Sequence, residues 1–378
     1  MHDEQTIHGT IIQGTELEPI EGYIVVRDGI IKEIVEEKID SANIIAPCFI
    51  NAHTHIGDSV LKDPVLGKCV DHFVERNLSE LVQPPNGLKH RVLNSTAHHE
   101  IVQAIHRSIN DMLQTGTCAF ADFREGGLQG CIALHEALEN TDIKAMILGR
   151  PKNIHSQKEG FQREIQNILE NADGLGMSGT NDQDMAVFEE SARIAKKNHK
   201  LFAIHAGENE RDDIPKALSL EPDILIHLTK ANDTDLKAIS DMEVPIVVCP
   251  RSNFITGVGM APIINMLKED IDVAVGTDNV MLNSVNMFSE MEILSKIFGI
   301  DDRQVFMMCT LMGGSVLGLE DIGPIQEGNR ANVMILNGNS NNLSGMKDPV
   351  SSIVRRGRPD DILSVIINTG HNHRGEGL

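Results

Sequence analysis

Aromatic residues are scarce in this chain. Its 378 residues include no tryptophan, one tyrosine and 11 phenylalanines, so aromatic residues make up 3% of the total. Proteins that bind single-stranded nucleic acid stack successive bases on aromatic side chains. Such stacking would depend here on phenylalanine, and the candidate surfaces are Phe73, Phe120, Phe123 and Phe254.

Basic residues are also in deficit. The chain has 33 Lys+Arg against 55 Asp+Glu, which gives a formal net charge of −22 at pH 7. A field of this sign repels phosphate backbones and anionic membrane surfaces. We therefore expect no nucleic-acid partner and no membrane partner.

Long hydrophobic runs and paired cysteines are missing as well. No stretch approaches the roughly 18 to 20 apolar residues of a membrane span, and residues 1–5 lack the basic and apolar regions of a secretory signal. The six cysteines are scattered without a CxxC pair, which argues against a disulfide framework and a cysteine zinc site. These features favour a cytoplasmic protein.

Short apolar runs alternate with amphipathic stretches between residues 44 and 322. In the stretch from Glu100 to Gln114, for example, apolar residues recur at helical spacing. Eight strands that alternate with helices predict an α/β protein with a (β/α)8 TIM barrel, whose chemistry takes place at the C-terminal ends of the strands. The expected strands are 44–50, 117–123, 144–148, 174–178, 201–204, 224–226, 245–249 and 273–275.

Both ends of the chain are rich in β-forming residues. Residues 7–46 alternate short β-rich runs with glycine turns, and similar runs at 325–328, 333–336, 353–354 and 365–367 follow the barrel region. We expect a small composite β-sandwich domain from residues 1–46 and 323–378, attached to a barrel domain of residues 47–322. A length of 378 residues suits one barrel with such an appendage.

Histidines recur where the expected strands end. The first strand runs into His53 and His55, the fifth into His205, the sixth into His227, and the eighth into Asp278. Side chains two apart on a strand face the same way, so both imidazoles of the first pair can point into the barrel mouth. Taken alone, that pair is equally compatible with two ordinary polar residues. Three or four imidazoles with one carboxylate match the ligands of zinc or ferrous iron.

Further polar residues follow the same strands. Glu208 comes three residues after His205 and could reach over the site as a general acid and base, although a carboxylate at a helix N-terminus is the alternative. Arg251, Ser252 and Asn253 leave the seventh strand in a turn and could line a polar substrate. Turn chemistry alone would also explain the serine and the asparagine.

Two arginines follow the second and third strands. Arg124 and Arg150 lie on loops that face the barrel mouth, where they could bind a carboxylate, a phosphate or a ring edge. Ordinary surface charge is the alternative for each of them. With Arg251, Ser252 and Asn253 they form the candidate substrate-binding set.

Together these motifs resemble the amidohydrolase superfamily. Within it they are similar to the aminohydrolase branch, which contains cytosine, guanine and S-adenosylhomocysteine/methylthioadenosine deaminases and triazine hydrolases. The motifs that carry the resemblance are His53-Thr54-His55, His205-Ala206-Gly207-Glu208, His227, the turn of residues 249–253 and Gly276-Thr277-Asp278.

The resemblance implies a role for each matching residue. His53, His55, His205 and Asp278 would hold one divalent metal ion, with zinc favoured over iron. Glu208, His227 and Asp278 would be the catalytic groups, of which Glu208 moves protons. Members with two metals carry a lysine at the end of strand four, and residues 174–178 contain none.

The resemblance also implies an activity. Hydroxide from a metal-activated water would attack an amino-substituted N-heterocycle, such as a purine, pyrimidine or pterin, and ammonia would leave. Alternatives are a metal-dependent hydrolase of a cyclic amide, a formimino group or a chlorotriazine, and, more remotely, a non-catalytic scaffold. The expected partners are a small heterocyclic substrate and, as in many members of this branch, further copies of the chain.

Overall fold

Two β-sheets organise the chain in the computed structural model, which describes residues 4–66, 75–152 and 158–368. The larger sheet has eight strands that pair in parallel and in chain order, and every residue of its first two strands is buried. Burial on both faces is typical of a barrel wall covered by helices. The strands are β5 (Phe49–Thr54), β6 (Thr117–Arg124), β7 (Lys144–Gly149), β8 (Gly174–Met177), β9 (Leu201–Ala206), β10 (Ile224–His227), β11 (Ile246–Val248) and β12 (Val273–Val275).

Helices connect successive strands and cover the barrel. In α3 (His98–Gln114) the side chains of Ile105, Ile109 and Met112 are buried, and the helix ends before Gly116, whose φ of 86° suits glycine. The other helices of this region are η1 (Ile56–Val60), α1 (Leu78–Leu81), α2 (Leu88–Ser95), α4 (Gly127–Leu138), α5 (Lys158–Leu169), η2 (Thr180–Asp182), α6 (Met185–Lys197), α7 (Ile214–Ser219), α8 (Asp233–Asp241), α9 (Pro250–Thr256), α10 (Ile263–Lys268), α11 (Met287–Lys296), α12 (Asp302–Cys309) and α13 (Leu311–Val316).

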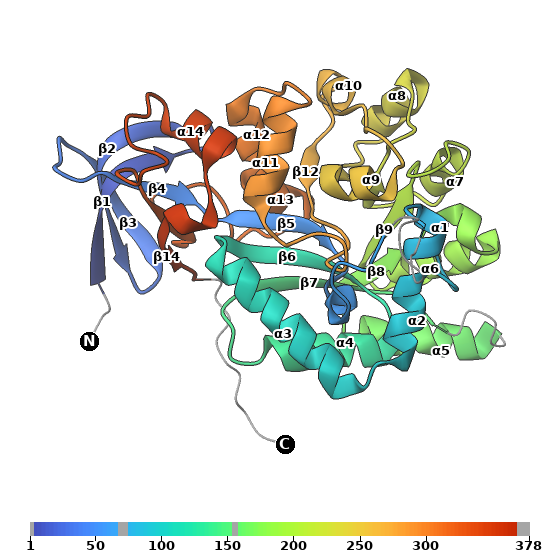
Figure 1. Cartoon of the computed structure of the whole chain (residues 1–378). Helices are drawn as coiled ribbons and strands as arrows, with labels where there is room; N and C mark the ends of the chain where they lie inside the picture. The colour runs from blue at the N-terminus through green and yellow to red at the C-terminus, as the bar shows by residue number, and fades with distance from the viewer. Residues whose placement is uncertain (1–3, 67–74, 153–157, 369–378) are drawn as a thin grey trace.

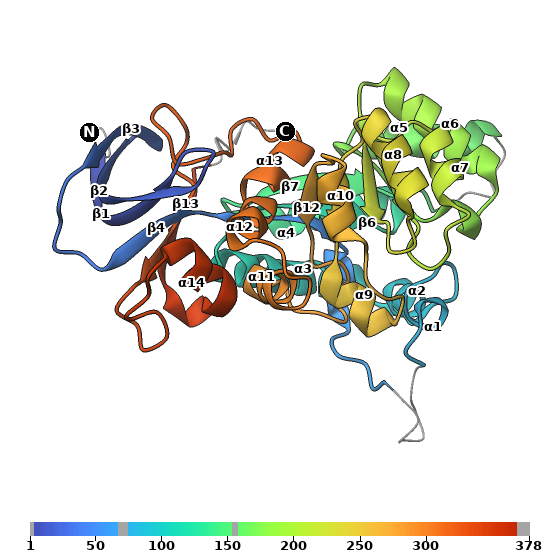
Figure 2. The ribbon, with the colours of Figure 1, turned by 90° about the horizontal axis from the view of Figure 1, so that it is seen from above.

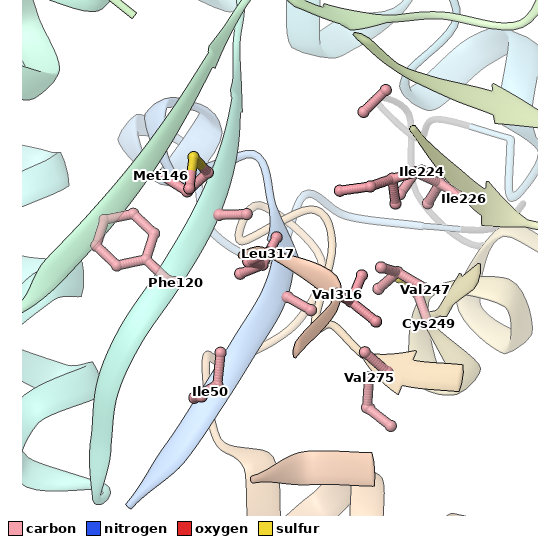
Figure 3. Packing of buried hydrophobic residues seen from close by; sticks show 14 of the residues in the cluster. Ile50, Phe120, Met146, Ile224, Ile226, Val247, Cys249, Val275, Val316 and Leu317 are labelled. Atoms are coloured by element: carbon pink, nitrogen blue, oxygen red, sulfur yellow. The ribbon is translucent and has the colours of Figure 1, made fainter. Parts of the chain in front are cut away.

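The barrel closes between its first strand and the residues after its last. A parallel bridge joins Thr54 to Asp278, the Asp278 amide donates to the His53 carbonyl at 2.9 Å, and the His55 amide donates to the Asp278 carbonyl at 3.2 Å. The predicted (β/α)8 barrel is therefore confirmed. Figure 3 shows buried side chains of several strands, among them Ile50, Phe120 and Val275, together with Val316 and Leu317.

The second sheet combines both ends of the chain. Its order is β14-β13-β4-β1-β2-β3, and a bridge between Ile30 and Arg330 curls it around a separate apolar cluster that includes Ile11, Ile24 and Val333. Its strands are β1 (Glu4–Gln13), β2 (Glu18–Arg27), β3 (Ile30–Glu36), β4 (Asn43–Pro47), β13 (Val333–Asn337) and β14 (Ile362–Ile366). In Figures 1 and 2 this sheet lies beside the barrel, on the side away from α5 to α8.

The first expected strand is in fact two strands. Residues 44–50 read as one apolar run, but β4 ends at Pro47 in the terminal sheet and β5 begins at Phe49 in the barrel. Cys48 lies between them and donates its amide to the Asn332 carbonyl at 3.1 Å. Both strands are buried on both faces, so hydrophobicity alone does not reveal where the chain passes from one sheet to the other.

Two β-like segments near the C-terminus do not form strands. Residues 353–354 lie in α14 (Pro349–Arg356), because Asp348 caps its first turn and Val350, Ile353 and Val354 are buried at helical spacing. Residues 325–328 form a turn that donates the Gly328 amide to the Ile31 carbonyl at 2.8 Å. None of the helices in the described residues has the length and apolar character needed to cross a bilayer.

Phe49 anchors the base of the barrel and gives a stability test. Its ring is fully buried, with its centroid 4.9 Å from that of Phe288 and 6.2 Å from that of Phe306, both edge-on. We expect Phe49→Ala to lower the free energy of unfolding by about 3–5 kcal/mol in urea titrations, because it leaves a cavity. Leu363→Ala, at a side chain 57% exposed, should change it by less than about 0.5 kcal/mol. Equal losses in the two variants would contradict this account of the core.

Candidate metal centre and active site

The C-terminal ends of four strands bring imidazoles and one carboxylate together. His53 comes from β5 and His55 directly follows it, His205 comes from β9 and His227 from β10, and Asp278 follows β12. All five side chains are buried, none with more than 8% of its surface exposed. They lie at the end of the barrel where residues of this fold carry out chemistry.

The ligand atoms of these residues lie close to one another. Asp278 Oδ1 is 3.3 Å from His53 Nε2 and 3.4 Å from His55 Nε2, and His55 Nε2 is 3.4 Å from His205 Nε2. Three overlapping groups have donor atoms within 4.8 Å of one another: His53, His205 and His227; His53, His55 and Asp278; and Glu208, His227 and Asp278.

Several of these atoms lack a partner within the protein. Both ring nitrogens of His53 and Oδ1 of Asp278 are buried without a hydrogen bond. Buried polar atoms are nearly always paired, because an unpaired one loses its hydration without compensation. Imidazole nitrogens and a carboxylate oxygen that converge in this way fit a divalent cation with nitrogen and oxygen ligands.

The remaining ring nitrogens of two histidines hold their orientation. Nδ1 of His55 lies 3.1 Å from the Phe123 carbonyl, and Nδ1 of His205 lies 2.7 Å from the Met177 carbonyl. A proton on Nδ1 that is donated to a carbonyl leaves the Nε2 lone pair free for a metal. Burial lowers the pKa of both imidazoles, that of His55 to about 3, so both remain neutral at physiological pH.

Glu208 lies beside His227 and Asp278. The turn that carries it depends on Gly207, whose φ is +58° and whose amide donates to Asp213 Oδ1 at 2.7 Å. Glu208 Oε2 then lies 3.6 Å from His227 Nε2. Burial raises the pKa of Glu208 to about 7, against the opposing effect of His227 and with a further contribution from Asp278. A carboxyl group with this pKa can both give and take a proton near neutrality.

Sequence reasoning places Ser252 and Asn253 in a turn after the seventh strand, but the structure places them in α9, where they hold site residues in place. Asn253 Oδ1 lies 3.0 Å from Nδ1 of His227, and the Ser252 hydroxyl donates to Asp278 Oδ2. The structure therefore places both side chains against catalytic candidates. Burial alone would raise the pKa of Asp278, but the imidazole of His53, whose Nε2 lies 3.3 Å away, holds that pKa well below its usual range.

The three predicted arginines have different surroundings. Arg124 is buried and pairs with Asp122 at 3.3 Å and Glu125 at 3.0 Å. Arg251 donates its Nε to Glu290 Oε1 at 2.7 Å. Among the three, Arg150 alone lines the cavity over the ligand cluster. The guanidinium groups of the other two are engaged by carboxylates, so the structure does not bring them to that cavity.

The candidate stacking phenylalanines lie mostly in the core. Phe120 and Phe123 are buried, and the Phe123 ring is 4.4 Å from that of His53 and 5.0 Å from that of His205. Phe254 is half-buried beside Phe298. Phe73 lies outside the described residues. Phe123 thus supports the ligand histidines from behind.

The cavity over the ligands includes residues that sequence reasoning missed. Lys89, Gln83, Asp182 and Asn279 line it together with Arg150 and Ser178. Lys89 and Gln83 belong to the segment between β5 and α3, where no strand end marks a residue as part of the site. Asn279 directly follows the predicted ligand Asp278, and that adjacency was the available signal.

Comparison with known proteins agrees with this geometry. The family model described as the amidohydrolase family matches residues 44–370. The chain therefore belongs to the amidohydrolase family, and it is a hydrolase that acts on carbon–nitrogen bonds.

Particular relatives are similar over nearly the whole chain. A protein named putative aminohydrolase from Methanothermobacter thermautotrophicus is 33% identical, with 95% of this chain and 96% of that protein covered. A 5-methylthioadenosine/S-adenosylhomocysteine deaminase from Acetivibrio thermocellus is 25% identical, with coverage of 95% and 89%. The fold matches a zinc-bound structure of an adenosine deaminase from Xanthomonas campestris with a TM-score of 0.82, 17% identity and coverage of 96% and 91%.

Gly276 provides a test of how the site is assembled. A Cβ at this position would lie 2.6 Å from His53 Cβ and 2.7 Å from the His53 backbone, so either strand would have to shift. We expect Gly276→Ala to destabilise the protein by about 1–3 kcal/mol and to reduce the zinc it retains through dialysis. In the control Gly323→Ala the new Cβ would meet only Asn329 Nδ2 at 3.6 Å. Full zinc retention in Gly276→Ala would contradict the tight packing of β12 against His53.

Proposed function

We propose that this protein is a mononuclear metal-dependent deaminase of amino-substituted N-heterocycles. One observation carries the proposal: ring nitrogens of buried histidines lie close to Asp278 Oδ1, the atoms of His53 and Asp278 have no hydrogen-bond partner, and the carboxyl group of Glu208 lies beside His227 and Asp278. The deaminase name of the Acetivibrio relative supports the same reaction class.

His53, His55, His205 and Asp278 would hold the metal ion. A divalent ion held there would lower the pKa of a water from 15.7 toward about 7 and so supply hydroxide at neutral pH. The end of β8 supports a single ion, since Ser178 stands in the cavity wall where bimetallic relatives carry a bridging lysine. Zinc in the Xanthomonas structure favours zinc over iron.

The acidic residues would handle the protons. Asp278 Oδ2 accepts a hydrogen bond from Ser252 and can take up the proton of the attacking water. Glu208 would give its proton to the ring nitrogen beside the amino-bearing carbon, the proton taken up by Asp278 would pass to the amino group so that it leaves as ammonia, and Glu208 would regain a proton from the added oxygen as the carbonyl forms. His227, fixed by Asn253, would donate a hydrogen bond to the oxygen that joins the ring carbon and so stabilise the tetrahedral centre.

The cavity walls favour a polar substrate. The charged side chains of Lys89, Arg150 and Asp182 line it, together with side-chain amides and a serine hydroxyl. No phenylalanine or tyrosine is among its lining residues in the described part of the chain. Recognition would thus rest on hydrogen bonds to ring nitrogens and oxygens, while stacking contributes little. A complete set of ligand residues also speaks against the non-catalytic scaffold.

Replacement of Glu208 tests the proton-transfer role. We expect Glu208→Gln to keep its metal and to lose about 10²–10⁴-fold in turnover, because the amide cannot donate and accept the proton in turn. The measurement is ammonia release with a responsive substrate, alongside metal analysis. Glu210→Gln, at an exposed residue of the same loop, should retain full activity. A Glu208→Gln variant with full turnover would remove Glu208 from the mechanism.

A substrate panel separates the proposed reaction from its alternatives. We expect ammonia from at least one amino-substituted purine, pyrimidine or pterin. Cyclic amides, formimino compounds and chlorotriazines serve as competing substrates, scored by ring opening or chloride release. Chloride release or ring opening without any ammonia would replace deamination by one of those reactions.

Metal removal tests the centre itself. We expect a purified chain to contain about one divalent ion, to lose ammonia release after dialysis against a chelator, and to recover it with zinc or ferrous iron. Two ions per chain at full activity would contradict the mononuclear site. Activity that survives complete metal removal would overturn the metal-dependent mechanism.

A further inference from the structure

Lys89 contacts two segments that lie beside metal-ligand candidates. It belongs to α2 and has only 3% of its surface exposed. Its Nζ lies 2.8 Å from Glu125 Oε1 and donates to Asn279 Oδ1 at 3.2 Å. Glu125 follows β6, and Asn279 is the neighbour of Asp278 in the chain. One ammonium group therefore contacts residues from two different strand ends.

Glu125 in turn contacts a ligand. Its Oε1 lies 2.7 Å from Nδ1 of His55, and its Oε2 accepts a hydrogen bond from Arg124 Nη2 at 3.0 Å. Lys89 Nζ and Arg124 Nη2 thus lie against different oxygens of this carboxylate, and Oε1 lies with the Phe123 carbonyl at the Nδ1 edge of the imidazole, opposite Nε2. Metal-binding histidines commonly have such a carboxylate behind them, and it sets both ring orientation and basicity.

We propose that Lys89 and Glu125 are positioning residues of the metal centre. Glu125 orients His55, while Lys89 holds Glu125 and, through Asn279, the turn that presents Asp278. The inference rests on the metal centre of the proposed function and not on the reaction, so it can be tested without a substrate.

The burial of Lys89 carries a free-energy cost. Burial of an ammonium group is unfavourable because the group loses its hydration, and a pair of well-packed apolar residues often replaces a buried ion pair without loss of stability. An ammonium group beside a cation site also repels the cation. The ion pair with Glu125 and the hydrogen bond to Asn279 Oδ1 offset part of these two penalties, so the stability of the fold alone does not account for the pair.

Charge repulsion by Lys89 and positioning by Lys89 predict opposite changes in zinc affinity when the residue is replaced. If the residue acts only through its charge, Lys89→Met removes a repulsive charge and should tighten zinc binding. If it positions Glu125 and Asn279, the same substitution should weaken zinc binding. We expect a weakening of about 10–100-fold, the range typical of residues behind metal ligands.

The experiment uses the full chain stripped of metal and zinc titrated against a competing chelator. Lys89→Met, Glu125→Gln and the double variant are compared with wild type, and Co²⁺ absorption spectra report the ligand geometry. The double variant removes both charges of the pair, so neither is left buried without its partner. It therefore provides a test even if a single variant misfolds. We expect weaker zinc binding and an altered Co²⁺ spectrum in all three.

A matched control has a buried carboxylate far from the site. Asp302 pairs with Arg355 at 2.6 Å and accepts a hydrogen bond from Ser295 at 2.6 Å. Asp302→Asn should lower the thermal midpoint without change in zinc affinity or Co²⁺ spectrum.

The possible failures are distinguishable. Unchanged or tighter zinc binding in Lys89→Met, or wild-type affinity in the double variant, would overturn the positioning role and leave the deaminase proposal intact. Absence of zinc binding in the wild type would overturn the metal centre, and with it both proposals.

Discussion

The closure of the barrel is the constraint on which the site depends. Thr54 pairs with Asp278, and the hydrogen bonds beside this bridge place the backbone of the first strand directly against the residues after the last. Segments more than 220 positions apart in sequence thus contribute ligands to one point. The contact is close because Gly276 has no side chain, and a Cβ there would overlap His53. The contacts that close the barrel therefore also set the positions of His53, His55 and Asp278.

The same constraint maintains backbone conformations that a free chain would avoid. Asp278 has a φ of 58° and His227 a φ of 76°, both in the left-handed region that non-glycine residues seldom adopt. Such conformations cost roughly 1–3 kcal/mol each and persist only where the surroundings determine them. Hydrogen bonds at the bridge hold Asp278, and Asn253 holds the ring of His227. The barrel stabilises a geometry that directs both side chains toward the cavity.

Sequence reasoning could locate the candidate ligands because two local signals coincide. A buried strand ends where its apolar run ends, and the barrel fold assigns chemistry to that end, so His205, His227 and Asp278 could be placed without knowledge of any contact. The start of the first barrel strand could not be predicted, because one apolar run passes from the terminal sheet into the barrel at Cys48. Ile353 and Val354 read as strand because a two-residue apolar pair has no period. Only the cap at Asp348 and the burial of Val350 reveal the helix.

The charges around the site could not be assigned from sequence, because a charged residue does not record whether a partner lies beside it. Sequence reasoning places Arg124 and Arg251 at the mouth of the barrel as positive groups. In the structure Arg124 is paired with the adjacent Glu125, and Arg251 is paired with Glu290, which is distant in sequence. Lys89 and Glu125 neutralise each other next to His55.

The arginine left to face the cavity is Arg150, whose Nη1 is 3.9 Å from Glu125 and whose Nε donates to the Gly176 carbonyl. Under the proposed function, selection of a substrate by charge would therefore depend on Arg150 more than on a positive field at the mouth, and the net charge of −22 does not describe this local environment.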